Sequence, residues 1–222
     1  MRGRFITFEG GEGSGKSTHA TLLAQRLNAA GIDALVTREP GGSPGAEIIR
    51  HVILSGAAKP LGPEAEAILF ASARSDHVSA TIRPALERGT WVVSDRFADS
   101  TRVYQGIVGE VDQRLIEGLE RIAVGETKPD LTFVLDLPAE LGLARALKRR
   151  GDAGADRFES ETLEFHEKLR AAYRDLALGE SERCVLIDAT APREQVANQI
   201  WRIVEERLHP AAAALGIGGA TP

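Results

Sequence analysis

The sequence predicts an α/β fold of three layers, in which helices cover both faces of a five-stranded parallel sheet. Short segments rich in β-branched and aromatic residues alternate with longer segments of helical periodicity, which is typical of this class. The strand segments are almost continuously apolar, as expected for strands that are covered on both faces. No internal repeat interrupts the alternation, so we expect a single domain over residues 1–209.

The predicted elements follow in order along the chain. Strands are expected at residues 4–9, 34–37, 90–94, 131–137 and 184–188. Helices are expected near residues 16–30, 45–55, 63–88, 112–124, 138–150, 161–178 and 192–208. Cys184 lies in the last strand, where we expect a buried structural thiol. The tail 210–222 is rich in Ala, Gly and Pro and carries no charge, so we expect it to be disordered.

Composition excludes several classes of protein. With 222 residues, 43% of them hydrophobic, the chain can bury a core without disulfides, and its single cysteine could not form one internally. No apolar stretch approaches the roughly 18 residues of a membrane span, and no leader sequence opens the chain, so we expect a cytoplasmic protein without a membrane partner. The net charge of −5 argues against a nucleic-acid partner.

The strongest local signal is a phosphate-binding loop at residues 10–17, which matches the pattern G-x-x-x-x-G-K-[ST]. The loop follows a predicted strand and opens a predicted helix, which is the context this motif requires. Glycines allow the backbone N–H groups to surround phosphate oxygens, Lys16 would reach the outer phosphates, and the Ser17 hydroxyl would bind Mg²⁺. The predicted ATP-binding residues are Gly10, Gly11, Glu12, Gly13, Ser14, Gly15, Lys16, Ser17 and Thr18.

Other features narrow the class of nucleotide-binding protein. The chain lacks the N-K-x-D run of GTPases, and Arg96 follows Asp95 where an ATPase motor usually carries Glu. Glu12 is unusual because a carboxylate beside a triphosphate is repelled. We expect Glu12 to face the hydroxyl of a second substrate or a metal-bound water; the alternative is a side chain that points to solvent.

Several segments together resemble the thymidylate kinase family of P-loop kinases, over nearly the whole chain. In the order of the family's motifs, they are residues 8–18, 38–42, 69–74, 95–97, 100–105 and 149–159. The resemblance implies a P-loop kinase fold with an acceptor-binding region at about 38–105 and a short lid at about 148–159. It also implies transfer of the ATP γ-phosphoryl group to dTMP, giving dTDP for DNA synthesis, with Mg²⁺ as cofactor and a homodimeric assembly.

The same resemblance implies roles for individual residues. Phe70 would stack on the thymine, Arg74 would contact the base, and Tyr104 would disfavour a 2′-hydroxyl. Asp95 would join Ser17 at Mg²⁺, and Glu12 would bind the 3′-hydroxyl. The implied dTMP-binding residues are Glu12, Arg38, Phe70, Arg74, Arg96, Thr101, Tyr104 and Gln105.

Members of the family take a catalytic arginine either from the P-loop or from the lid. The variable positions of this P-loop carry no basic residue, whereas Arg149, Arg150 and Arg157 flank the Gly-containing stretch 151–154. The chain therefore resembles the bacterial subclass with a lid arginine, with Arg149 and Arg157 favoured. The implied catalytic residues are Lys16, Arg96, Arg149, Arg157 and Glu12.

Two departures from the family's pattern, Arg102 and the run 107–110, are expected near the base and sugar pocket, where the acceptor is recognised. Two alternatives remain open. One is a kinase for another nucleoside monophosphate, since the thymine methyl is worth only about 1–3 kcal/mol of discrimination. The other is a regulatory protein that hydrolyses ATP without an acceptor.

Overall fold

The computed structural model describes residues 2–150 and 157–209, and it confirms the predicted α/β/α fold. Five parallel strands form one sheet in the order β2-β3-β1-β4-β5. Their bounds are Phe5–Glu9 (β1), Ala34–Arg38 (β2), Trp91–Asp95 (β3), Leu131–Asp136 (β4) and Cys184–Asp188 (β5). The predicted strands therefore agree to within one residue at each end. Because β1 lies between β3 and β4, the carboxyl ends of β1 and β3 form the crevice where such sheets bind ligands.

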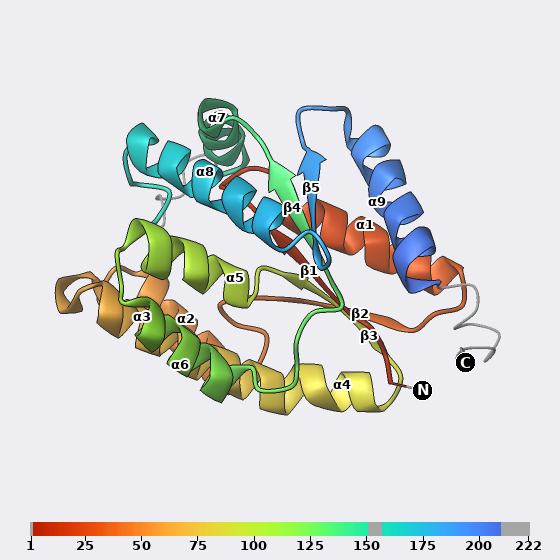
Figure 1. Ribbon diagram of the computed structural model, residues 1–222, viewed down its shortest axis with the longest axis horizontal. Helices are drawn as coiled ribbons and strands as arrows, with labels where there is room; N and C mark the ends of the chain where they lie inside the picture. Colours follow the sequence, from red (N-terminus) through yellow and green to blue (C-terminus); the bar gives the residue numbers. More distant parts are fainter. Residues whose placement is uncertain (1, 151–156, 210–222) are drawn as a thin grey trace.

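Helices cover both faces of the sheet, with α1 (Lys16–Ala29) and α9 (Arg193–Leu208) together on one of them (Figure 1). The strands alternate between two cores, as period-2 geometry requires. Ile6 and Phe8 of β1 belong to the core under α1 and α9. Phe5, one residue before Ile6, points to the opposite side and packs with Phe97 and Val92.

The opposite layer is larger. It contains α8 (Leu163–Gly179), which packs on β4 and β5, and α4 (Arg83–Glu87), which packs on β3. Further helices lie outside these: α2 (Pro44–Leu54), α3 (Pro63–His77), α5 (Ala98–Thr101), α6 (Gln113–Ala123) and α7 (Ala139–Arg150). The predicted helix 63–88 consists of α3, a π-helical turn at Val78–Ile82, and α4. In Figure 1, α2, α3 and α6 lie side by side, and close contacts join α2 to α3 and α3 to α6.

One helical segment was not predicted. It consists of α5 and a π-helical continuation at Arg102–Val108, and it connects β3 to α6. The segment is short, and its second part does not follow the periodicity of an α-helix, so no amphipathic pattern in the sequence indicates it.

The remaining expectations concern burial and the ends of the chain. Cys184 is 3% exposed, as predicted, and burial raises the pKa of its thiol to about 12. No helix in the part of the chain that the structure describes is long and apolar enough to cross a membrane. The tail 210–222, expected to be disordered, lies outside the described residues, so the domain bounds of 1–209 remain a prediction.

Candidate active site at the carboxyl ends of β1 and β3

The predicted phosphate-binding loop connects the end of β1 directly to the start of α1. Gly10, Gly13 and Gly15 have φ of 129°, 65° and 98°, conformations that side chains with a Cβ rarely adopt. At Gly13 a Cβ would also overlap the backbone carbonyl of Gly142 in α7. The loop thus keeps its shape because glycine allows both the backbone conformation and the close approach of α7.

Three of the predicted polar residues lie at the mouth of this loop. The Lys16 ammonium is 7% exposed and donates to the carbonyl oxygen of Gly11 at 2.7 Å. Burial and the nearby Arg96 charge lower the Lys16 pKa to about 8, against the opposing effect of Glu12 and Asp95. The Ser17 hydroxyl donates to the Asp95 carboxylate at the end of β3. The loop therefore carries a cation and a hydroxyl–carboxylate pair close to where phosphates would bind.

Arg96 follows β3 in a strained conformation. Its φ is 69°, which is uncommon for a residue other than glycine and is often found at functional sites. Its side chain is 14% exposed and lies in front of the P-loop. Nη2 donates to Glu12 Oε1 at 2.5 Å and to the Tyr104 hydroxyl at 3.1 Å, while Nη1 donates to the carbonyl of Gly10 at 3.1 Å. Neighbouring oxygens thus hold the guanidinium in one orientation.

Glu12 faces this guanidinium, and its side chain is only 16% exposed, so the solvent-facing alternative is wrong. It also accepts a hydrogen bond from the Tyr104 hydroxyl at 3.1 Å. Burial alone would raise the Glu12 pKa, but the charges of Arg96 and Lys16 outweigh it and lower the pKa to about 2. Glu12 is therefore ionised at neutral pH. Both of its hydrogen bonds to described residues involve Oε1, so among these residues Oε2 is available to a hydroxyl donor.

These groups line a cavity of about 330 Å³ that extends from the P-loop toward α2, α3 and residues 158–159. The predicted residues on its wall are Glu12, Gly13, Gly15, Lys16, Ser17, Thr18, Arg38, Phe70, Asp95, Arg96, Thr101, Tyr104, Gln105 and Arg149. Its far end is aromatic: Tyr104 meets Phe158 edge to face at 5.2 Å between ring centroids, and Phe70 lies 6.1 Å from Phe158. One cavity thus combines a cationic, phosphate-binding end with an apolar end.

Five predicted residues do not line this cavity: Gly10, Gly11, Ser14, Arg74 and Arg157. The first three are P-loop positions, of which Gly10 and Ser14 are buried. Arg74 is 3% exposed; its Nε donates to Glu39 at 2.7 Å and its Nη2 donates to Thr101 Oγ1 at 3.1 Å. In this structure Arg74 thus supports the cavity wall from behind through Glu39 and Thr101, and direct contact with a base remains a prediction.

The predicted lid is described only in part. Residues 151–156 lie outside the described residues, as does the side chain of Arg150. Arg149 lines the cavity and pairs with Glu159 at 3.1 Å. Arg157 instead pairs with Glu66 of α3 and with Glu161, at 3.2 Å and 2.5 Å. Of the two favoured lid arginines, only Arg149 therefore lies at the cavity.

The structure adds residues that sequence reasoning did not assign to the site. Glu39, Ser100, Phe158 and Glu159 line the cavity within segments that carry the family resemblance. Glu9, at the end of β1, is fully buried and lies directly behind Arg96's partners. The available signal for Glu9 was a carboxylate at the end of an otherwise apolar strand, since such a group is rarely buried without a partner.

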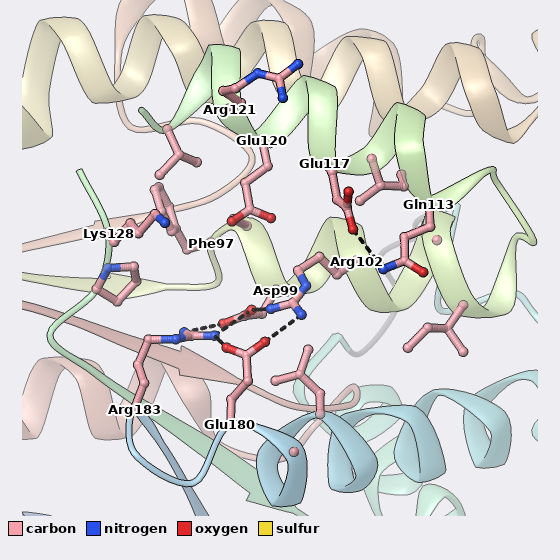
Figure 2. Close-up of a pocket in the computed structure, with 18 of the residues that line it drawn as sticks. Phe97, Asp99, Arg102, Gln113, Glu117, Glu120, Arg121, Lys128, Glu180 and Arg183 are labelled. Carbon is pink, nitrogen blue, oxygen red and sulfur yellow. Dashed lines mark hydrogen bonds and ion pairs between the residues drawn. The ribbon is translucent and has the colours of Figure 1, made fainter. Parts of the chain in front are cut away.

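A larger cavity, of about 900 Å³, lies at the opposite ends of the strands between α5, α6 and the turn before β5 (Figure 2). Its wall carries no P-loop residue. Its charged centre is neutralised internally: Arg183 and Arg102 both pair with Asp99 and Glu180 (Figure 2). The sequence led us to expect Arg102 near the base and sugar pocket. This expectation is wrong, because Arg102 lies on the other face of its helix. The second departure is divided between the two cavities. Ile107 lines this larger cavity, whereas Val108 packs against the cluster that contains Tyr104 and Phe158.

The donor set at the P-loop fits Mg²⁺ of the kind that ATP brings with it. No cluster of three or more His, Cys, Asp or Glu side chains suited to a metal occurs among the described residues. Ser17 and Asp95 nevertheless place a hydroxyl and a carboxylate together beside the phosphate-binding loop. Mg²⁺ typically takes one or two protein oxygens there and completes its coordination with phosphates and water.

Comparison with known proteins gives the family. A sequence model described as thymidylate kinase matches residues 8–200. The chain belongs to the thymidylate kinase family. A protein named thymidylate kinase from Bradyrhizobium diazoefficiens is 59% identical over 214 residues, covering 96% of this chain and 94% of the relative. Thymidylate kinases from Nitrobacter hamburgensis and Rhodopseudomonas palustris are 59% and 60% identical over 208 residues, covering 94% and 93% of this chain and 90% of each relative. The similarity to thymidylate kinases thus covers nearly the whole chain.

Proposed function

We propose that this protein transfers the γ-phosphoryl group of ATP to dTMP, forming dTDP for DNA synthesis in the cytoplasm. One observation carries the proposal: Lys16 of the P-loop and Arg96 line the same cavity, and the aromatic residues Phe70, Tyr104 and Phe158 line it as well. Such a cavity suits a nucleoside monophosphate whose phosphate faces the P-loop and whose base meets the rings. The family relationship supports dTMP as that acceptor.

On the donor side, backbone N–H groups of residues 10–18 bind the ATP phosphates, and Lys16 neutralises the outer ones. Mg²⁺ held beside Ser17 and Asp95 would supply charge neutralisation between the donor phosphates. Phosphoryl transfer needs little covalent chemistry from the protein, because its transition state is stabilised mainly by positioning and by electrostatics. Lys16 and Arg96 supply positive charge where the transferred group passes between the two nucleotides in line.

On the acceptor side, the Arg96 guanidinium binds the monophosphate as a planar fork, with Arg38 on the same side. Phe70 stacks on the thymine ring, and Thr101 and Gln105 bind its polar edge, with Arg74 behind them. Tyr104 lies against the sugar and excludes a 2′-hydroxyl. The second carboxylate oxygen of Glu12 accepts a hydrogen bond from the 3′-hydroxyl.

A catalytic arginine from the lid completes the site in this proposal. Arg149 is the better candidate than Arg157, because it lines the cavity while Arg157 is paired with two carboxylates. Closure of the lid over ATP would exclude water, which otherwise competes with dTMP as the phosphoryl acceptor.

The protein is further proposed to be a homodimer. Helices α2, α3 and α6 form one layer that exposes large apolar side chains: Ile48 is 71% exposed, Ile68 47% and Ile122 77%. A second copy of this chain would cover this apolar surface, which combines side chains from helices far apart in the sequence.

The direct test measures ADP production from ATP and Mg²⁺ with dTMP, dUMP, the ribonucleotide of thymine, dCMP, AMP or no acceptor. Strong turnover with dTMP, weaker turnover with dUMP and little with the ribonucleotide are expected. If another nucleotide gave the highest turnover, that nucleotide and not dTMP would be the acceptor. Turnover that does not depend on any acceptor would contradict the kinase proposal and favour the regulatory ATPase.

A further inference from the structure

Glu9 is a buried carboxylate that the proposed chemistry does not use directly. Its side chain is fully buried at the end of β1. Oε1 accepts a hydrogen bond from the backbone N–H of Phe97 at 2.7 Å. Oε2 accepts from the Ser100 hydroxyl at 2.6 Å and from the Tyr173 hydroxyl at 3.1 Å. A carboxylate so far from solvent requires an explanation, because burying its charge is costly.

The two hydroxyls that donate to Glu9 also contact Arg96. Arg96 Nη1 donates to the Ser100 hydroxyl at 3.2 Å and to the Tyr173 hydroxyl at 3.1 Å. Each hydroxyl has only one proton. When both protons point to Glu9, the oxygen lone pairs are free to accept from Arg96. The two hydroxyls also lie 2.9 Å from each other, where either could donate. Because an ionised carboxylate can only accept, Glu9 favours the arrangement in which the hydroxyl protons point to Glu9 and the lone pairs point to Arg96.

We propose that Glu9 is a positioning residue for the phosphate-binding arginine: it orients the Ser100 and Tyr173 hydroxyls and so holds the Arg96 guanidinium in the acceptor cavity. The inference rests on the proposed function. The three partners come from α5, from α8 and from the loop after β3, so one carboxylate joins elements from distant parts of the chain at Arg96. The strained backbone of Arg96, at φ 69°, is consistent with a side chain whose position is imposed by its surroundings.

An amide at this position cannot do the same. In Glu9→Gln the amide oxygen can replace only one carboxylate oxygen. If the amide NH₂ faces Phe97, two donors meet; if it faces Ser100 and Tyr173, their protons must turn toward Arg96 and repel it. The first arrangement keeps the two hydroxyls oriented only at the cost of a buried donor–donor contact with Phe97, and the second turns the hydroxyl protons against the guanidinium and releases it. Neither arrangement removes an atom from the cavity wall.

Several charged groups act on Glu9. Burial and then Asp99 of α5 raise its pKa, while Arg96 and the hydrogen bonds from Ser100 and Phe97 lower it, and the net result is a pKa of about 7. Lys16 of the P-loop and Tyr173 of α8 also interact with it electrostatically. Protonation would have the same effect as the amide, because a protonated Glu9 no longer accepts from both hydroxyls. Affinity for the acceptor should therefore weaken as the pH falls through about 7.

The experiment compares steady-state kinetics of wild type, Glu9→Gln and Tyr173→Phe, which removes only one connecting hydroxyl. Thr7→Val is the matched control, because Thr7 is fully buried in the same strand but bonds to Thr132, not to a partner of Arg96. We expect KM for dTMP to rise about tenfold or more in Glu9→Gln and less in Tyr173→Phe, with KM for ATP within about twofold in all variants. The two effects should not add in the double variant, since they act through one network.

The pH dependence supplies a second readout. Between pH 5.5 and 8.5, KM for dTMP in wild type should show an inflection near pH 7 that Glu9→Gln lacks. The ionisation of the substrate phosphate, near pH 6, should remain in both. Folded Glu9→Gln and Tyr173→Phe with KM for dTMP within twofold of wild type would overturn the inference. If Glu9→Gln fails to fold, Tyr173→Phe decides. Wild type without turnover of dTMP would instead refute the proposed function.

Discussion

Arg96 Nη2 donates to Glu12 Oε1 at 2.5 Å, although the two residues lie in loops that follow different strands. Because β1 and β3 are neighbours in the sheet, their carboxyl ends bring the P-loop carboxylate and the strained arginine together. The pair places a negative group between two cations, since Lys16 also acts on Glu12. This arrangement explains how a P-loop can carry a carboxylate: its charge is compensated within the protein before any phosphate binds.

Replacing Arg96 with lysine should reduce kcat/KM for dTMP by about 100-fold, because one ammonium cannot replace a planar fork with hydrogen bonds on both Nη atoms. Arg102→Lys is the matched control. Arg102 lies six residues further along the chain, but it lines the cavity at the opposite ends of the strands. Kinetics with dTMP should change less than twofold in this control. A large loss in Arg102→Lys would show that the two cavities are coupled, contrary to their separation in the structure.

Local patterns predicted the strands and the P-loop because their determinants are adjacent in the sequence. Residues 10–17 need only each other and a preceding strand to form the loop. Arg102 was placed wrongly because it lies between Thr101 and Tyr104 in one motif, whereas the helical segment turns it to the other side. Residues 102–108 are π-helical, with a backbone bond from Gly109 N–H to the Tyr104 carbonyl. In such a segment the spacing of an α-helix no longer indicates which residues share a face.

Contacts between distant residues could not be predicted in the same way. Glu9 and Tyr173 are separated by 164 positions, and only the packing of α8 on the sheet brings them together. Nothing in the sequence around Tyr173 distinguishes it from an ordinary apolar position of an amphipathic helix. The ion pair between Arg157 and Glu66 of α3, which holds Arg157 away from the cavity, depends on the tertiary structure in the same manner.

The stability of the folded protein should depend on Glu12 at acid pH. The Glu12 pKa is lowered from 4.5 to about 2, so the unfolded chain binds more protons than the native state between these values. The stabilisation is therefore present above pH 4.5 and is lost as the pH falls toward 2, at about 3 kcal/mol in total. Urea unfolding of wild type and Glu12→Gln from pH 6 to pH 3 measures this. The advantage of wild type should shrink over that range; a constant difference would show that Glu12 is not stabilised by Arg96 and Lys16.

The apolar surface of α2, α3 and α6 should control assembly. Ile48→Glu and Ile68→Glu each place a charge on the proposed contact between two copies, where an unpaired charge costs several kcal/mol once buried. Light scattering coupled to size exclusion should give twice the monomer mass for wild type and the monomer mass for the variants. Leu178→Glu is the control, because Leu178 is 68% exposed on α8, outside these three helices. A monomeric wild type, or dimeric variants, would contradict the proposed assembly.

Gly13→Ala should strongly destabilise the P-loop, whereas Gly11→Ala should not. At Gly13 the φ of 65° disfavours any side chain, and the new methyl group would overlap the Gly142 carbonyl in α7. Relieving that overlap requires α7 to move away from the loop, because backbone atoms cannot rotate aside as a side chain can. At Gly11 nothing lies within 4 Å of an added Cβ. Thermal unfolding should therefore show a loss of about 2–4 kcal/mol for Gly13→Ala and less than about 1 kcal/mol for Gly11→Ala. Equal losses in both variants would mean that the contact with α7 does not determine the cost of a side chain in this loop.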